Sequence, residues 1–242
     1  MGALIVTELK LLSRSIEFLV IAILFPAVFF LIMSEVFGNL SAGSLDMVTY
    51  MMISMVAFGA ISGAISVGQR VAPERQAGWN RQLRLTPLPG WSYVASKVVV
   101  SLVIVLPAVV LILAAGFLIK GVELSLTQWG LVLLAAWLGS LPFGVLGLLI
   151  GLAVKPDAVG AVYVAAFLML ALFGGLWVPV EILPGFMGAF AHALPSFWLA
   201  EQARNLATGG GLDLLGVLVS AAWFFIAGAL VVMLYKRDAA RV

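Results

Sequence analysis

Long apolar runs constrain this chain more than any other feature. A run of about 20 apolar residues crosses the hydrocarbon core of a bilayer as one helix, because a helix satisfies its own backbone hydrogen bonds. The chain has 242 residues, of which 64% are hydrophobic and 10% charged, far outside the composition of a soluble domain. The runs predict spans near residues 18–37, 48–69, 97–119, 129–153, 158–178 and 212–235. We therefore expect an all-α integral membrane protein, folded as one domain over residues 1–242.

The distribution of Lys and Arg sets the expected orientation. Cytoplasmic loops of membrane proteins carry an excess of these residues. With six spans, every Lys and Arg except Lys120 and Arg204 falls on one side of the membrane, whereas the acidic residues divide almost evenly. The sequence thus predicts a multi-pass protein of the cell inner (plasma) membrane with both termini in the cytoplasm.

The segment between the second and third expected spans, residues 70–96, concentrates positive charge and is interrupted by proline and glycine. Its charged side chains are Arg70, Glu74, Arg75, Arg81 and Arg84, and Lys97 follows directly. Pro89 suits the first turn of a helix, where its missing donor costs nothing, so we expect a short helix from Pro89 to Ser96. Trp91 and Tyr93 would give that helix amphipathic rings for an interface. A generic positive loop remains the alternative.

The first residues form a helical pattern that precedes the first expected span. Its apolar face comprises Ile5, Leu9, Leu12, Ile16 and Leu19. Its opposite face comprises Thr7, Lys10, Arg14 and Glu17. This spacing predicts an amphipathic helix over residues 4–17 that lies in the membrane interface. The alternative is a polar helix start whose long side chains extend to the headgroups.

The segment before the last expected span, residues 179–208, is too apolar for a solvated loop and too interrupted for a span. Its prolines and charges include Pro179, Glu181, Pro184, Pro195 and Arg204. We expect short helices that dip into the outer leaflet, packed against other parts of the protein. The lone histidine, His192, lies here too, where a structural hydrogen bond is favoured over a catalytic role.

The order of motifs in the basic segment resembles the first cytoplasmic loop of type 2 ABC exporter permeases. It reads Glu74-Arg75-x-x-Gly78, then Leu83-Arg84-x-Thr86-Pro87-Leu88, then the Pro89–Ser96 segment. The resemblance extends over the whole chain and implies a coupling helix that rests on a separate ATPase subunit, an elbow helix at the N terminus and an outer lid. It assigns ATPase coupling to Glu74, Arg75, Gly78, Arg81, Arg84, Thr86, Pro87, Pro89, Trp91 and Tyr93. It assigns the elbow to Lys10, Arg14 and Glu17, and the lid to Pro179, Glu181, Pro184, Pro195 and Arg204.

The second expected span offers a deformable apolar face with a few hydroxyl groups. Its candidate substrate-path residues are Met51, Ser54, Met55, Phe58 and Ser62. Methionine and aromatic side chains suit varied amphipathic ligands, although ordinary helix packing explains the same pattern. By resemblance, the first, second and fifth spans line a cavity between two permease copies, or between one copy and a related permease.

Several chemistries are absent from the sequence. There is no cysteine, and no Gly-x-x-x-x-Gly-Lys-Ser/Thr phosphate loop, so the usual ATP site is missing. We expect no catalytic, cofactor or metal site in this chain and no nucleic-acid partner; by resemblance, ATP and Mg²⁺ bind the partner ATPase.

The resulting hypothesis is the permease subunit of an ATP-driven ABC exporter that moves an amphipathic drug-like or lipid-like substrate. By analogy the resemblance extends to multidrug efflux and antibiotic resistance. The alternative is a membrane scaffold that recruits a cytoplasmic partner through the basic segment without transport. A lipid-processing enzyme is disfavoured because the sequence lacks a buried polar cluster.

Overall fold

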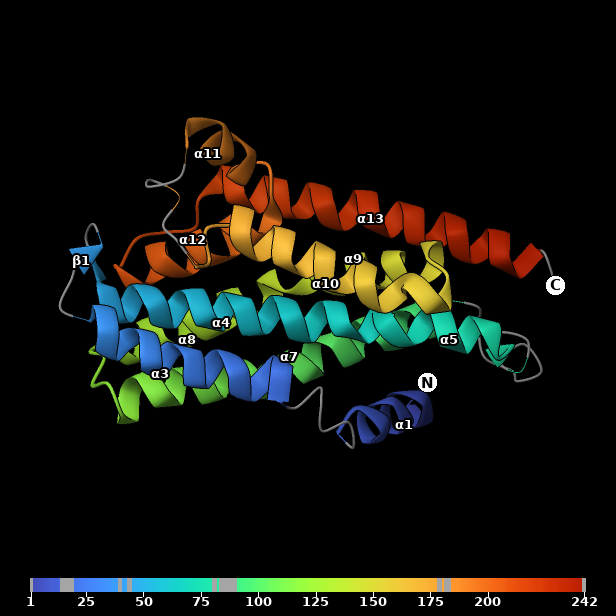
Figure 1. The fold of residues 1–242 in the computed structure, drawn as a ribbon, viewed down its shortest axis with the longest axis horizontal. Coiled ribbons are helices and arrows are strands. Elements are labelled where there is room, and N and C mark those ends of the chain that lie inside the picture. The colour runs from blue at the N-terminus through green and yellow to red at the C-terminus, as the bar shows by residue number, and fades with distance from the viewer. Residues whose placement is uncertain are drawn as a thin grey trace.

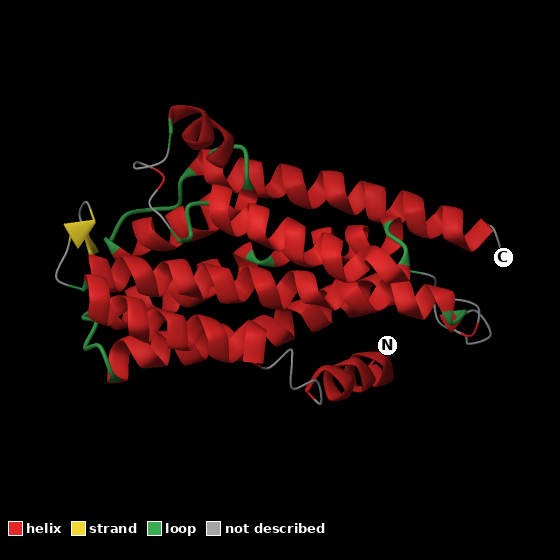
Figure 2. Ribbon diagram, in the orientation of Figure 1, coloured by secondary structure: helices red, strands yellow, loops and turns green. Residues whose placement is uncertain are grey.

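The computed structural model describes residues 2–13, 20–38, 41–42, 45–79, 82, 91–177, 180 and 184–240. Helices make up most of it, as the red ribbons of Figure 2 show. Two strands of two residues each, β1 (Ser41–Ala42) and β2 (Leu45–Asp46), pair antiparallel. The bundle is elongated, with β1 and α11 toward one end and α1, α5 and the C terminus toward the other (Figure 1). The expected all-α class is confirmed.

The helices follow one another along the chain with short connections. They are α1 (Gly2–Ser13), the π-helical turn η1 (Val20–Leu24), α3 (Phe25–Phe37), α4 (Met47–Ser66), the 3₁₀ turn η2 (Val67–Arg70), α5 (Val71–Gln76), α7 (Ser92–Leu118), α8 (Leu126–Gly139), α9 (Leu141–Ala153), α10 (Pro156–Phe173), α11 (Gly185–Ala191), α12 (Pro195–Ala207) and α13 (Leu214–Ala240).

Five helical segments of the described chain are long and apolar enough to cross a membrane. They are Met47–Gln76, Ser92–Leu118, Leu126–Ala153, Pro156–Phe173 and Leu214–Arg237. Each overlaps one of the expected spans. The first expected span, residues 18–37, corresponds to a shorter apolar helix, Ala22–Phe37. The chain is therefore a multi-pass helical membrane protein.

Local chemistry explains where several helices begin. The carboxylate of Asp46 accepts a hydrogen bond of 2.8 Å from the backbone N–H of Thr49 and caps α4. Ser125 and Gln128 form a reciprocal capping box at the start of α8. Pro142 lies in the first turn of α9, directly after Ser140 ends α8, so the fourth span is broken near its middle.

The expected segment between the second and third spans, residues 70–96, requires correction. The helix that starts as α4 continues through η2 and α5 to Gln76, so Glu74 and Arg75 lie on a helix. At the other end, Ser92 to Ser96 form the first turns of α7 and do not belong to a separate short helix. Pro89, the expected start of that helix, lies outside the described residues.

The core of the bundle surrounds α4. In its apolar stretch 94% of the residues are buried inside the chain, against 22% for α10 and 11% for α13. Glycines permit the closest contact with α9, since a Cβ at Gly68 would lie 1.8 Å from the carbonyl oxygen of Gly147. A Cβ at Gly151 would lie 2.2 Å from the carbonyl oxygen of Gly68. Thus α4 is the innermost helix, whereas α10 and α13 present apolar faces outward.

Two short helices, α11 and α12, occupy the segment between the fifth and sixth spans. Pro184 is the N-cap of α11, and Pro195 lies in the first turn of α12. Most of α12 is buried, including Trp198, Leu199 and Ala203. It packs against α4, α8 and α13, so it forms part of the core at this end of the bundle.

Candidate functional site

A buried ionic cluster joins three helices at the end of the bundle that carries the chain termini. The ammonium group of Lys97 on α7 lies 2.5 Å from Glu8 Oε1 on α1 and 2.6 Å from Glu74 Oε1 on α5. The hydroxyl of Tyr93 donates a hydrogen bond of 2.6 Å to Glu74 Oε2. Lys97 also lies 5.4 Å from the centroid of the Tyr93 ring. We call Glu8, Glu74, Tyr93 and Lys97 the Lys97 cluster.

The Lys97 cluster contains two carboxylates and one ammonium group in a site from which water is largely excluded. The side chain of Lys97 is 0% exposed and that of Glu8 10% exposed. One oxygen of Glu8, Oε2, is buried without a hydrogen-bond partner. Desolvation of buried ions offsets most of their attraction, so such a cluster fixes the geometry of its helices more than it adds net stability. It defines how α1, α5 and α7 meet.

Two arginines extend this polar joint to a fourth helix. Arg75 on α5 donates hydrogen bonds to the carbonyl oxygens of Gly151, at 3.2 Å, and Leu152, at 2.6 Å. These carbonyls belong to the last turn of α9, where helix carbonyls lack partners within the helix. Arg70 donates to the carbonyl of Leu11 on α1 at 3.1 Å. Helices α1, α5, α7 and α9 are therefore tied together by polar contacts at one end.

The residues expected to couple to an ATPase are only partly described. Glu74, Arg75 and Tyr93 are engaged inside the chain, and Tyr93 is only 3% exposed, so its ring does not offer the surface that was expected. Trp91 is 63% exposed and does offer one. Gly78 follows α5 in the left-handed conformation, with φ of 74°, which glycine adopts without strain. Those outside the described residues are Arg81, Arg84, Thr86, Pro87 and Pro89.

The residues expected in the elbow are also only partly described. Lys10 is exposed on α1, whereas Arg14 and Glu17 lie outside the described residues. Ile5 and Leu9, from the expected apolar face of this helix, pack against Val67, Val100 and Ile104. The apolar face of α1 is thus in contact with the body of the protein.

A second buried charge holds the opposite end of the bundle together. Arg204 on α12 donates a hydrogen bond of 2.8 Å from Nη2 to the hydroxyl of Ser54 on α4. Its guanidinium carbon lies 3.9 Å from the ring centroid of Tyr50, and Nη1 lies 3.3 Å from a carboxylate oxygen of Glu201. Arg204 is 7% exposed, and its Nε has no hydrogen-bond partner. We call Arg204, Ser54 and Tyr50 the Arg204 latch, because it fastens α12 to α4.

The structure describes only two of the other four residues expected in the lid. Pro184 and Pro195 start the two short helices, whereas Pro179 and Glu181 lie outside the described residues. His192 accepts or donates a hydrogen bond with the carbonyl of Gly188, and its ring packs on Phe197. The structural role expected for His192 fits these contacts.

The candidate substrate-path residues of α4 are packed inside the chain. Ser54, Met55, Phe58 and Ser62 are all buried, and only Met51 is partly exposed. The hydroxyl of Ser62 donates to the carbonyl of Gly59 in its own helix at 3.2 Å. The Phe58 ring lies 4.7 Å from that of Phe167 on α10. In this conformation the contacts are those of ordinary helix packing, the alternative that the sequence left open.

Sequence reasoning did not single out the pairing of Glu8. It counted Lys97 with the basic segment and assigned Arg204 to the lid, without a partner for either. One signal was present for Glu8, which lies three residues after Ile5 and four before Leu12, on the apolar face of its helix. A charge on such a face needs a buried partner. For Arg204 no comparable local signal exists, since Ser54 lies 150 positions away.

The described part of the chain contains no group of three or more His, Asp or Glu residues with metal-binding geometry. The expectation that the chain lacks a buried polar cluster is wrong, because Glu8, Glu74, Tyr93 and Lys97 form one. Its members pair with one another and connect helices.

The fold and this polar joint define an all-α, multi-pass membrane protein whose helices are tied together at one end. The family model of the ABC-2 type transporter matches residues 1–207. The chain is also 28% identical over 222 residues to the protein named "Putative transport permease YvfS" of Bacillus subtilis (strain 168), which covers 91% of each chain. The chain belongs to the ABC-2 type transporter family. It is a membrane permease, and membership implies association with an ABC ATPase.

Proposed function

We propose that this chain is the permease subunit of an ATP-driven exporter. In this proposal two permeases, or one copy and a related permease, work with two ATPase subunits in the inner membrane, and both termini lie in the cytoplasm. ATP and Mg²⁺ bind the ATPase subunits. The observation that carries the proposal is the Lys97 cluster, which lies beside the segment where the ATPase is expected to bind.

The geometry of the Lys97 cluster suits transmission of movement. Glu74 lies on the helical extension of α4, Lys97 near the start of α7, and Glu8 on α1. A force applied to α5 by the ATPase therefore moves α1 and α7 with it, because separating any of them leaves a buried charge unpaired. The cluster thus converts a push on one short helix into a joint displacement of two spans and the N-terminal helix.

At the other end, the Arg204 latch is suited to close the outward path. It fastens α12 to α4, the helix that carries the candidate substrate-path residues. Among them, Phe58 packs against Phe25 of α3 and Phe167 of α10, so a path past Phe58 requires α3 or α10 to move away. Transport then corresponds to a change between two arrangements of packed helices, whose balance is shifted by nucleotide on the ATPase.

The substrate class follows from the side chains that such a movement would expose. Met51, Met55 and Phe58 present deformable apolar surface, and Ser54 and Ser62 add hydroxyl groups. This composition favours an amphipathic drug-like or lipid-like molecule. Lateral movement from the membrane into the path would bring such a molecule directly to α4.

Capture of the ATPase tests the proposal. The tagged chain is purified from its native host in mild detergent, and co-purifying proteins are identified by mass spectrometry. We expect an ATPase with a phosphate loop, and its recovery should fall in the variant Trp91→Ala, because Trp91 is exposed beside the proposed contact. The same loss is expected when Arg81 and Arg84 are replaced by Glu.

The matched control is Leu126→Ala, which also removes a large exposed apolar side chain but at the opposite end of the bundle. It should leave recovery of the ATPase unchanged. Intact chain recovered without any ATPase, under conditions that preserve other membrane complexes, would contradict the exporter and favour the scaffold.

A further inference from the structure

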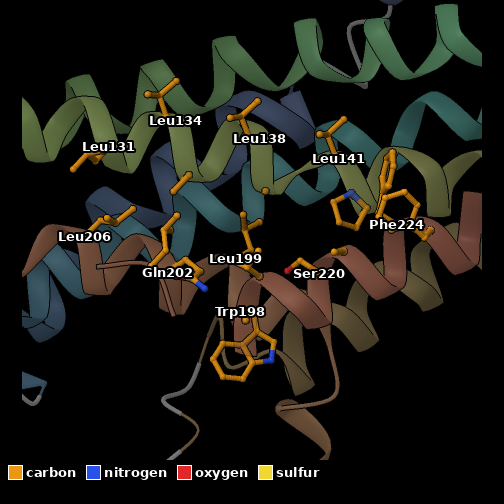
Figure 3. A pocket seen from close by; sticks show the side chains of 18 residues that line it. Leu131, Leu134, Leu138, Leu141, Trp198, Leu199, Gln202, Leu206, Ser220 and Phe224 are labelled. Atoms are coloured by element: carbon orange, nitrogen blue, oxygen red, sulfur yellow. The ribbon is translucent and has the colours of Figure 1, made fainter. Parts of the chain in front are cut away.

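A narrow apolar crevice opens between the fourth and sixth spans, on the α12 end of the bundle. It has a volume of about 430 Å³, within the range of about 300–1,000 Å³ typical of ligand sites. One wall is α8 with the start of α9, the other is α13, and α12 forms the floor (Figure 3). None of the residues that line it belongs to the Lys97 cluster or the Arg204 latch.

The crevice exists because the fourth span is broken. On the C-terminal side of the break α9 packs closely on α13, whereas on its N-terminal side α8 packs on α12. Gly139 and Gly216 allow α12 to rise between the two walls, since a Cβ at Gly139 would lie 2.5 Å from Leu199. A Cβ at Gly216 would lie 2.5 Å from the Trp198 ring. The floor is therefore formed by Trp198 and Leu199.

The lining of the crevice is almost entirely apolar. Its two largest polar side chains are already engaged by the backbone: Gln202 bonds with the carbonyl and the N–H of Asp213 at 2.6 and 2.8 Å. The indole N–H of Trp198 donates to the carbonyl of His192 at 2.7 Å. Ser220 adds one hydroxyl. A ligand with a charged or strongly polar body would leave its own groups unsatisfied here.

The mouth of the crevice is bordered by exposed apolar side chains. Leu134 and Leu138 on α8 are 45% and 50% exposed, and Phe225 on α13 is 69% exposed. Both walls belong to segments that are long and apolar enough to span the membrane. At this depth the surroundings are acyl chains, so the material available to fill the crevice is hydrocarbon.

The length of the crevice suits one acyl chain. Between Gly216 and Phe225, which both line it, α13 rises roughly 14 Å, close to half of the hydrocarbon thickness of about 30 Å, or one leaflet. We therefore expect it to accept an extended acyl chain.

We propose that this crevice binds one acyl chain of a phospholipid of the outer leaflet. The chain packs along Leu134, Leu138 and Phe225 and ends against Trp198 and Leu199. The bound lipid contacts α12 from the side opposite the Arg204 latch. The assignment to the outer leaflet rests on the orientation given with the proposed function, whereas the ATPase and the transported substrate play no part in it.

Photolabelling in proteoliposomes tests the proposal. The purified chain is reconstituted with phosphatidylglycerol that carries a diazirine group on one acyl chain, irradiated without nucleotide, and digested for mass spectrometry. We expect adducts on residues 131–142 and 212–225 at several times the level found on α7. The exposed side chains Val99, Val103 and Leu111 of α7 report the background of lipid that touches any spanning helix.

A pair of neighbouring alanines provides the matched variants. Ala221 lines the crevice, whereas Ala222 is exposed and does not line it. Ala221→Phe should lower the crevice adducts to the level of α7, and Ala222→Phe should leave them unchanged. If Ala221→Phe does not fold, Leu138→Trp narrows the crevice from an exposed position on the opposite wall and serves the same purpose.

Three results would overturn the proposal. Adducts spread evenly over α7, α8 and α13 would show that the crevice holds no lipid beyond ordinary contact. Crevice adducts that persist equally in Ala221→Phe and Ala222→Phe would show that the acyl chain lies elsewhere on the same helices. Absence of crevice adducts, with α7 still labelled, would likewise reject lipid and indicate that another occupant, such as a hydrophobic small molecule or a protein, covers this face.

Discussion

Lys97 stands between two carboxylates, and its removal should be the most damaging single change at the Lys97 cluster. Lys97→Met keeps the apolar stem but leaves Glu8 and Glu74 buried beside each other without a cation. Loss of one member of a buried ion pair costs about 3–5 kcal/mol. We expect a drop of this order in the free energy of unfolding, measured by denaturant titration in mixed micelles.

Two variants separate the effect of charge from that of shape. Lys236→Met removes an exposed cation from α13 and should change the free energy of unfolding by about 0.5 kcal/mol or less. Glu8→Gln reduces the cluster to one carboxylate and one ammonium group, so it should cost far less than Lys97→Met. Equal losses for Glu8→Gln and Lys97→Met would contradict a cluster governed by charge balance.

At the scale of single residues, the sequence identified the charged side chains but not the partners with which they pair. Glu8 and Lys97 lie 89 positions apart, and Arg204 and Ser54 lie 150 apart. Patterns within one helix carry no information on such partners. Periodicity predicted the apolar face of α1, whereas the partner that makes Glu8 acceptable on that face emerged only once α1, α5 and α7 were placed together.

At the scale of helices, the contact between the second span and α9 should depend on Gly68, which has no side chain. A Cβ at Gly68 would meet the backbone of Gly147, which cannot rotate away. We expect Gly68→Ala to separate the helices and to lower both the yield of folded protein and its melting temperature by several degrees. Thermal unfolding followed by size-exclusion chromatography in detergent would measure this effect.

Gly160→Ala on α10 is the matched control, because nothing lies within 4 Å of a Cβ at that position. Replacing glycine by alanine inside a helix stabilises it by about 0.5–1 kcal/mol when space is available. The melting temperature of Gly160→Ala should therefore stay the same or rise. A Gly68→Ala protein as stable as the wild type would show that the two helices are less closely packed than described.

Hydropathy located the spans well because a helix needs about 20 consecutive, mostly apolar residues to cross the hydrocarbon core. It ended the second span at residue 69, whereas the helix continues through polar residues to Gln76. Glu74 and Arg75 stay helical since their side chains find partners on α7 and α9. Hydropathy detects the end of the membrane, and the end of the helix here is set by these later contacts.

For the molecule as a whole, the orientation in the membrane can be read with introduced cysteines, since the natural chain has none. We expect Leu126→Cys, at the first residue of α8, which is 90% exposed, to react with a membrane-impermeant maleimide in intact spheroplasts. Lys236→Cys, near the C terminus, should react only after permeabilisation. The measurement is gel shift or mass spectrometry of the labelled chain.

Reaction of Lys236→Cys in intact spheroplasts, with Leu126→Cys protected, would reverse the proposed orientation and place the Lys97 cluster outside the cell. Since the basic residues gather at that end of the bundle, such a result would also contradict the positive-inside distribution. A permeable or leaky preparation is recognised by reaction of both variants.

The separation of Glu8 from Lys97 also has a consequence for biosynthesis. Ribosomes add about 5–20 residues per second, so Lys97 is synthesised roughly 4–18 s after Glu8. During that interval the carboxylate of Glu8, on the apolar face of the N-terminal helix, lacks the cation with which it pairs in the folded chain. Its docking must await synthesis of the third span, and the first part of the chain to be made is then among the last to reach its final position.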